Sequence, residues 1–326
     1  MTRAASDTKP VRGPIRRWLR RTLALALGLC LLTLALFCWN GIVLANDEAV
    51  LMGVAPAGEA TPAKDAGQRA GARAGHGQGE LRVLAFNLAK LFLHRGGLSF
   101  DTTAKVRERL AAVAAIIRKQ DPDLVFLSET IHECTLCPVD QVEELATATG
   151  LWHWAFGENF NFGLPFLRIV GGNAILSRHE LEPVQNQSLA GRKPFWITRN
   201  NRRALWCATM IDGVRVLVAS IHNDSFDLDN NLAQVRQLLT RCADQPSLLA
   251  GDFNAEPGDV SIRALQDSGR FSGEIEGSPT YSSRDPRRRI DYILGPNTWI
   301  VLEHRVIPNE VSDHSAVFTR FRVKTR

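Results

Sequence analysis

Cysteine is scarce in this sequence, and its spacing offers only one candidate pair of metal ligands. The 326-residue chain has six cysteines, of which Cys134 and Cys137 form a single C-x-x-C motif. A structural zinc site needs a second pair of ligands at matching spacing, so the pattern argues against a zinc finger. In an oxidising compartment we expect Cys134 and Cys137 to form a local disulfide, with a redox role or two free thiols as the alternatives.

Excess positive charge is absent from the part of the chain that is expected to fold. The formal net charge is +5, but residues 1–21 hold seven Lys or Arg and one Asp, whereas residues 80–326 hold 29 basic and 29 acidic residues. The folded part is therefore no polycation, and its net charge does not argue for nucleic-acid binding. An internal repeat of fixed period is also lacking, which excludes a repeat architecture.

A long apolar run is present near the N-terminus. Residues 1–21 are basic, and residues 22–45 form an uncharged stretch long enough to cross a bilayer as a helix. Because basic residues favour the cytoplasmic side, we expect a single-pass membrane protein whose C-terminal domain is extracytoplasmic. The alternative is a signal peptide cleaved near Val43-Leu44-Ala45, which would leave a secreted or periplasmic protein. Residues 46–79, rich in Ala, Gly and Pro, are expected to form a flexible linker to a catalytic domain at 80–326.

Apolar strands alternate with helical patterns from residue 81 onward. Strands are predicted at 81–87, 124–128, 173–176, 204–211, 214–221, 247–250, 290–294 and 316–323, and helices at 105–120, 232–240 and 260–265. The Asp212-Gly213 pair between two of these strands predicts a tight hairpin turn. Strands joined partly by hairpins and partly by helices indicate an α/β sandwich with mixed sheets.

Two short motifs point to phosphate chemistry. In Gly251-Asp252-Phe253-Asn254, which follows a buried strand, Asp252 and Asn254 are two residues apart and point the same way. A carboxylate and an amide at one strand end suit Mg²⁺ and a phosphate. In Ser312-Asp313-His314, a carboxylate stands beside an imidazole, which can supply a metal ligand and a phosphate-binding histidine.

Further polar residues occur where the predicted strands end. They are Asn87, Glu129, His222 and Asp291. Active sites are built at such strand ends, because loops vary there on a rigid frame. Several carboxylates converging on one point repel each other unless a cation neutralises them. The pattern therefore predicts a metal-assisted site.

The residues of the two motifs and of the predicted strand ends, taken in the order of the chain, resemble those of the endonuclease/exonuclease/phosphatase superfamily. This superfamily includes deoxyribonuclease I, exonuclease III-type abasic-site endonucleases, neutral sphingomyelinases and inositol polyphosphate 5-phosphatases. The resemblance covers about residues 80–326 and extends to Gly172–Arg178, Arg203-Ala204-Leu205 and Pro279-Thr280-Tyr281. It implies a four-layer α/β sandwich, in which two packed mixed β-sheets are flanked by helices, and a metal-dependent phosphoric ester hydrolase.

The resemblance also implies a role for each residue. Glu129 is expected to bind Mg²⁺, with Mn²⁺ as an alternative, and Asn87 and Asp313 are expected on the metal side. Asp252 would orient or deprotonate the attacking water, and Asn254 would hold the phosphate. His314, held by Asp291, and His222 would donate to phosphate oxygens. Weaker expectations for phosphate contact fall on Asn173, Arg178, Arg203 and Arg289.

Two positions depart from the family pattern. Ser220-Ile221-His222-Asn223 stands where the family often has Asn-Thr-His-Leu, and Asn231 stands where an Arg commonly precedes the residue corresponding to Gln234. These departures put the environment of His222 and a phosphate-contacting role for that helix in doubt.

The substrate is the least determined property. The leading hypothesis is nucleic acid, for which basic clusters at Arg192-Lys193, Arg199, Arg202-Arg203, Arg284 and Arg287–Arg289 could supply phosphate contacts. The alternative is a phospholipid or a small phosphoester, favoured by the apolar segment Phe160–Leu167, which could dip into a bilayer. A non-catalytic binding module is a remote third hypothesis. No protein partner can be inferred.

Overall fold

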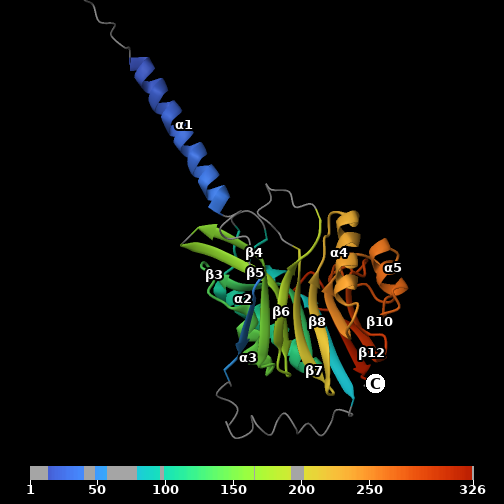
Figure 1. Ribbon diagram of the computed structural model, residues 1–326. Helices are drawn as coiled ribbons and strands as arrows, with labels where there is room; N and C mark the ends of the chain where they lie inside the picture. Colours follow the sequence, from blue (N-terminus) through green and yellow to red (C-terminus); the bar gives the residue numbers. More distant parts are fainter. Residues whose placement is uncertain are drawn as a thin grey trace, which may run out of the picture.

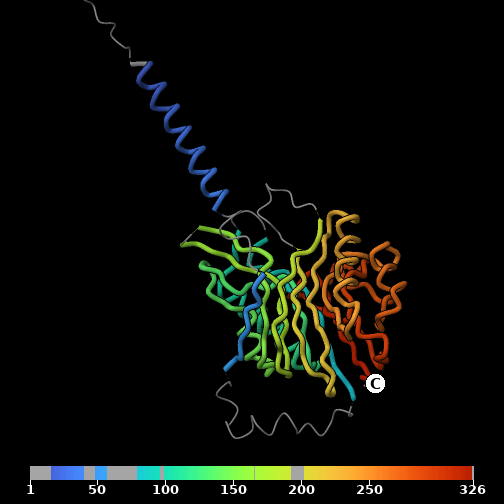
Figure 2. Tube along the Cα trace, viewed as in Figure 1, coloured from blue at the N-terminus to red at the C-terminus, as the bar shows by residue number. Residues whose placement is uncertain are grey.

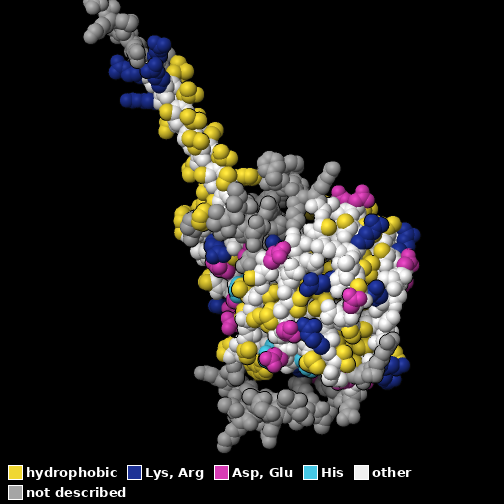
Figure 3. Space-filling model, viewed as in Figure 1, with side chains coloured by type: hydrophobic (Ala, Val, Ile, Leu, Met, Phe, Trp, Pro, Cys, Tyr) yellow, Lys and Arg dark blue, Asp and Glu magenta, His cyan; other side chains and the backbone are white. Residues whose placement is uncertain are grey.

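The computed structural model describes residues 14–39, 48–56, 79–95, 99–164, 166–191 and 202–324. The proposed cleavage site at 43–45, most of the predicted linker (57–78) and the basic residues Arg192, Lys193 and Arg199 lie outside the described residues. The first described element is the helix α1 (Pro14–Cys38), of which the segment Arg16–Cys38 is long and apolar enough to cross a membrane and is mostly exposed. In Figure 3 its basic side chains gather at one end and apolar side chains cover the rest.

The described residues from 48 onward form two β-sheets packed face to face (Figure 1). In order, the first sheet contains β1 (Val50–Val54), β4 (His153–Leu164), β5 (Leu167–Ser177), β3 (Leu124–Cys134), β2 (Glu80–Asn87), β13 (Ala316–Arg322) and β12 (Ile300–Ile307). The second contains β10 (Phe271–Ser272), β11 (Asp291–Pro296), β9 (Ser247–Asp252), β8 (Val214–His222), β7 (Arg203–Ile211) and β6 (Glu182–Ser188). The pairs β2–β3 and β8–β9 are parallel and the others are antiparallel, so both sheets are mixed. Segments far apart in the sequence meet in the first sheet, where β13 near the C-terminus lies beside β2 (Figure 2).

Alternating side chains divide the interior into three apolar layers. In β2, Leu81 and Val83 face the second sheet, whereas Leu84 and Phe86 face the helices α2 (Thr103–Gln120) and α3 (Gln141–Thr149). On the far side of the second sheet, Trp206 packs with α4 (Leu228–Arg241) and α5 (Val260–Asp267). Successive strand residues point to opposite faces, so each strand contributes to two layers. The predicted four-layer sandwich is confirmed.

The predicted strands and helices are all present, with bounds that differ by a few residues. The Asp212-Gly213 turn has φ of 48° and 77°, as a two-residue hairpin requires. The elements that the sequence pattern missed are α3, β1, β4, β6, β10 and β12, together with the short helical turn η3 (Ala89–Phe92). The strand β4 contains Gly157, Asn159 and Asn161 among its aromatic residues, so its apolar pattern is weak.

Two predictions are wrong where the structure describes them. Residues 50–54 belong to the predicted linker, yet they form β1 and pair along β4. Gly53 lies directly against the Trp154 ring, which is why a glycine stands there: a Cβ at this position would lie 2.2 Å from a ring carbon. Cys134 and Cys137 are free, buried thiols that pack in the helix-side core, so the predicted disulfide is absent.

The contact between Gly53 and Trp154 provides a test of β1. We expect Gly53→Ala to destabilise the protein by about 1–3 kcal/mol, because the added methyl group forces the ring or the edge strand to move. The matched variant Gly258→Ala adds the same group into open space, and its free energy of unfolding should stay within about 0.5 kcal/mol of the parent value. Denaturant melts measure both. Equal stability of the two variants would mean that residues 50–54 do not form part of the sheet.

Candidate active site

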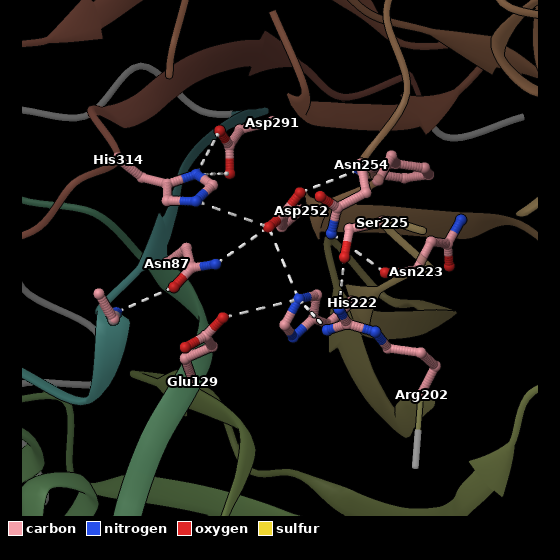
Figure 4. A network of polar contacts seen from close by, with 12 residues as sticks. Asn87, Glu129, Arg202, His222, Asn223, Ser225, Asp252, Asn254, Asp291 and His314 are labelled. Atoms are coloured by element: carbon pink, nitrogen blue, oxygen red, sulfur yellow. Dashed lines mark hydrogen bonds and ion pairs between the residues drawn. The ribbon is translucent and has the colours of Figure 1, made fainter. Parts of the chain in front are cut away.

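The site is assembled where strands of the two sheets end (Figure 4). In the second sheet, His222 at the end of β8 and Asp291 at the start of β11 both lie in register with Asp252, the last residue of β9. From the first sheet, Asn87 ends β2, whereas Glu129 lies within β3, which continues to Cys134, and not at a strand end as the sequence pattern predicts. The strand register therefore fixes the polar side chains relative to one another before any loop is considered.

Asp252 lies at the centre of the network. Its Oδ2 accepts a hydrogen bond from Asn87 Nδ2 at 3.0 Å, and its Oδ1 accepts one from the Asn254 backbone N–H at 2.9 Å. Gly251 before it has φ of 136°, and a Cβ there would lie 2.3 Å from the Ile221 carbonyl oxygen, so only glycine lets β9 approach β8 this closely. Burial and the neighbouring Asp291 raise the pKa of Asp252 to about 7.

His314 and Asp291 form a hydrogen-bonded pair beside Asp252. His314 Nδ1 donates to Asp291 Oδ2 at 3.0 Å, which leaves His314 Nε2 facing Asp252 Oδ2 at 3.8 Å. Burial alone lowers the pKa of His314, but the carboxylates of Asp291 and Asp252 raise it to about 10. The imidazole is thus cationic at neutral pH and is oriented by a carboxylate, as the sequence predicted.

Glu129 enters the site from a bulge in β3. The register with β5 shifts between Leu127 and Thr130, and Glu129 itself has φ of 53°. A bulge re-aims a side chain that would otherwise follow the strand alternation. Glu129 forms an ion pair with Lys90, whose own backbone has φ of 58°. Burial opposes ionisation, but the positive charges of Lys90 and Arg202 lower the pKa of Glu129 to about 2.

His222 is bonded in a way that the sequence did not predict. The Arg202 guanidinium contacts His222 Nε2, and its other amino group donates to Ser225 Oγ at 2.9 Å. Because an arginine has only donors, His222 Nε2 accepts this hydrogen bond and the ring proton lies on Nδ1. Burial and the Arg202 charge lower the pKa of His222, so the ring is neutral.

Arg202 and Lys90 are therefore two site residues that sequence reasoning missed. The sequence places Arg202 only in a basic cluster that could contact nucleic-acid phosphates, yet it is buried. Neither residue stands in a motif, and no sequence signal separates them from the other cations of the chain.

The helix after β8 takes a structural role. Asn231 donates to the carbonyl oxygens of Asp224 and Phe253, and Gln234 accepts from the Asp224 N–H. Asn254, with φ of 52°, donates through its side chain to the carbonyl of Asn223. These bonds hold the loop after β8 against the loop after β9.

The residues present fit a divalent cation. Ligand atoms of Asp252, Asp291 and His314 all lie within 4.8 Å of one another, but the protonated His314 has no lone pair for a cation, so the candidate ligands are the carboxylates and the Asn87 amide. The half-buried carboxylate of Glu129 already holds a cationic group, and Asp313 Oδ1 is buried with no hydrogen-bond partner among the described residues. Carboxylate and amide oxygens form the donor set that Mg²⁺ prefers.

The four weaker phosphate candidates do not reach this network. Arg178 lies at the other end of the first sheet, where it pairs with Asp121 and Asp123, so its prediction is wrong. The other three are buried and donate to backbone carbonyls: Asn173 to Arg203 and Ser220, Arg203 to Asn186, and Arg289 to Glu274, Ile275 and Ser278. These contacts join strands and loops behind the site.

Comparison with known proteins gives a consistent result. The model of the endonuclease/exonuclease/phosphatase family matches residues 84–314. A search of curated proteins found no significant match. Among solved structures, an endonuclease/exonuclease/phosphatase from Beutenbergia cavernae is similar with a TM-score of 0.57 at 22% identity, covering 75% of this chain and 72% of that one. A mannosyl-6-phosphatase from Bacteroides thetaiotaomicron gives 0.55 at 14% identity, covering 74% and 99%.

A third similar structure is the human nocturnin catalytic domain with bound sulfate, with a TM-score of 0.53 at 19% identity, covering 74% of this chain and 93% of that one. At these identities the structural likeness concerns the fold.

The raised pKa of Asp252 predicts a cost in stability. In the unfolded chain an Asp ionises near 3.8, whereas in the fold Asp252 ionises near 7. Stability contributed by this group therefore falls as the pH rises between these values and stays low above them. With metal chelated at pH 8.5, Asp252→Asn should melt at a higher temperature than the parent protein, and the difference should shrink at pH 5. The exposed control Asp244→Asn should show no such pH dependence. A lower melting temperature for Asp252→Asn at pH 8.5 would contradict the burial argument.

Proposed function

Because the chain belongs to the endonuclease/exonuclease/phosphatase family, whose members hydrolyse phosphoesters, we propose that this protein is a metal-dependent hydrolase of phosphodiester bonds. The observation that carries the proposal is the buried Asp252, held by Asn87 and flanked by the cationic His314. A base, a cationic donor and a set of carboxylates within one network are the groups that phosphoester hydrolysis requires.

Asp252 is proposed as the base. With a pKa of about 7 it can accept a proton from water near neutral pH. The bond from Asn87 Nδ2 fixes Oδ2, and the bond from the Asn254 backbone fixes Oδ1, so the carboxylate cannot rotate away from the incoming water. Asn254 would also hold a phosphate oxygen, as predicted.

His314 and Arg202 are proposed to stabilise the phosphate. His314 keeps its proton because Asp291 and Asp252 raise its pKa, so Nε2 can donate to a phosphoryl oxygen that gains charge. His222 was expected to donate as well. Since its Nε2 accepts from Arg202, we assign the donation at this position to the Arg202 guanidinium and a positioning role to His222.

Glu129, Asn87 and Asp313 are proposed to hold Mg²⁺, or Mn²⁺. A bound divalent cation would neutralise the carboxylates and polarise a phosphoryl oxygen. Without a bound cation, Lys90 compensates the charge of Glu129. Lys90 would have to release this carboxylate when a cation binds.

The helix α1 is proposed as a membrane anchor with the catalytic region outside the cytoplasm. Its length and its exposed apolar surface support this proposal, as do the arginines at its N-terminal end.

The proposed chemistry is tested by two substitutions. With bis(4-nitrophenyl) phosphate and Mg²⁺, His314→Ala and Asp252→Ala should each lower kcat by about 10²–10⁴-fold, the usual contribution of a positioned acid or base. Chelation should abolish activity in the parent protein. Arg178→Ala, at the far end of the sheet, serves as the control and should keep parental kcat. Full activity after either site substitution would refute the assigned mechanism.

The proposed topology is tested in intact cells. A C-terminal tag should be digested by protease added outside the cytoplasmic membrane, while an N-terminal tag on the same chain stays protected. Replacing Arg16, Arg17, Arg20 and Arg21 by Glu should weaken this orientation, because it removes the positive charge that retains the N-terminus inside. Protection of the C-terminal tag in the parent protein would overturn the proposal.

A further inference from the structure

A cavity of about 610 Å³ opens from the candidate active site. Its inner end is formed by Lys90, Glu129 and His222, which belong to the network described above. Its remaining walls are mostly apolar and include Leu93, Ile131 and Ile169. A substrate whose phosphate lies in this network, beside Glu129 and His222, therefore has its neighbouring substituent in an apolar chamber.

The walls come from segments that the chain brings together only here. The hairpin β4–β5 supplies Phe160 and Ile169, the end of β3 supplies Ile131, and the segment after η3 supplies Leu93 and Phe100. Gly163 lets the hairpin close, because a Cβ there would lie 1.8 Å from the Leu167 carbonyl oxygen. Asn159 adds one buried side-chain oxygen with no hydrogen-bond partner among the described residues, so the wall can accept a bond from a hydroxyl or amide near the phosphate.

The outer rim of the cavity is apolar and exposed. Leu136 and Phe162 line the cavity and are 54% and 47% exposed, and Phe166 in the hairpin turn is 76% exposed. Neighbouring exposed apolar side chains of this size mark surfaces that contact a membrane or a partner. Here the rim is continuous with an apolar chamber that ends at the phosphate site.

The described basic clusters give little support to a nucleic-acid groove. Arg203 and Arg289 are buried and their hydrogen bonds go to other groups of the protein, and the buried Arg202 serves only the one phosphate of the proposed site. Arg287 pairs with Asp285 and Arg288 with Glu256. Few of these cations are left to neutralise successive phosphates of a strand.

We propose that this cavity binds an acyl or alkyl chain of a phospholipid, and that the Leu136–Phe162–Phe166 rim contacts the bilayer that supplies it. The proposal rests on the proposed phosphodiesterase function and names its substrate class. An apolar chamber beside a few convergent polar groups is the usual form of a site that binds a largely apolar ligand. The anchor proposed for α1 would keep the catalytic region close to such a substrate.

The test uses the full chain in detergent and 4-nitrophenyl phosphodiesters that carry a methyl, butyl, octyl or dodecyl group. We expect kcat/KM to rise at least about tenfold from methyl to octyl, since each methylene that leaves water favours binding. No hydrolysis of any ester would refute the phosphodiesterase function itself. Hydrolysis without dependence on chain length would overturn only the lipid proposal, as would faster cleavage of a thymidine dinucleotide than of the dodecyl ester.

Two variants test whether the dependence of the rate on chain length arises in the cavity. Ile169→Trp fills the chamber, so the ratio of dodecyl to methyl ester rates should fall towards one. If that variant does not fold, as shown by loss of its cooperative melt, Leu167→Trp makes the same test from the neighbouring wall. A ratio that stays at the parental value in a folded variant would show that the chain binds elsewhere.

The rim is tested with the dodecyl ester embedded in phosphatidylcholine vesicles. The variant Phe166→Ser should lose at least about fivefold in rate on vesicles and keep its rate on the soluble methyl ester, because Phe166 belongs to the exposed rim and not to the cavity lining. Met210→Ser is the control: Met210 is 53% exposed and lies at the opposite end of the second sheet. An equal loss in the control, or no loss in Phe166→Ser, would contradict a membrane-contacting rim.

Discussion

The charge balance around Asp252 is the interaction on which the rest of the site depends. Two buried carboxylates, Asp252 and Asp291, lie in register on adjacent strands, and their repulsion contributes to the raised pKa of Asp252. His314 offsets this repulsion from one side and Arg202 from another. Such a cluster persists only because the sheets around it are rigid. The same imbalance suits Asp252 to the proposed role of a base near neutral pH, and a bound cation would offset the carboxylates further.

Strand register, rather than loop conformation, fixes the positions of these charged side chains. His222, Asp252 and Asp291 come from three adjacent strands of the second sheet. Asn87 reaches across from the first sheet to Asp252, so the central hydrogen bond also joins the two sheets. The bulge at Glu129 then turns one further carboxylate into the same space. A shift of either sheet would therefore disturb the chemistry as well as the core.

Much of this could be predicted from the sequence, for identifiable reasons. The buried strands carry long apolar runs, and the site residues follow them, as Asp252 follows Ser247–Ala250. The strand β4 was missed because Gly and Asn interrupt its pattern, and β1 because its run of five residues is short and lies within a region rich in Ala, Gly and Pro. Arg202 and Lys90 were missed because the partner of an arginine or a lysine, and its burial, are known only once the chain has folded. The apolar cavity likewise exists only after three distant segments meet.

The central claim is that these side chains form a cation-dependent phosphoesterase site. The most direct measurement is the anomalous scattering of crystals soaked in Mn²⁺, collected for the parent protein and for Glu129→Gln. The account predicts an anomalous peak within the network of Glu129, Asn87, Asp252 and Asp313 in the parent protein, and a peak that is lost or much reduced in the variant. A fully occupied peak elsewhere, or none in crystals of protein that hydrolyses phosphodiesters with Mn²⁺, would contradict it.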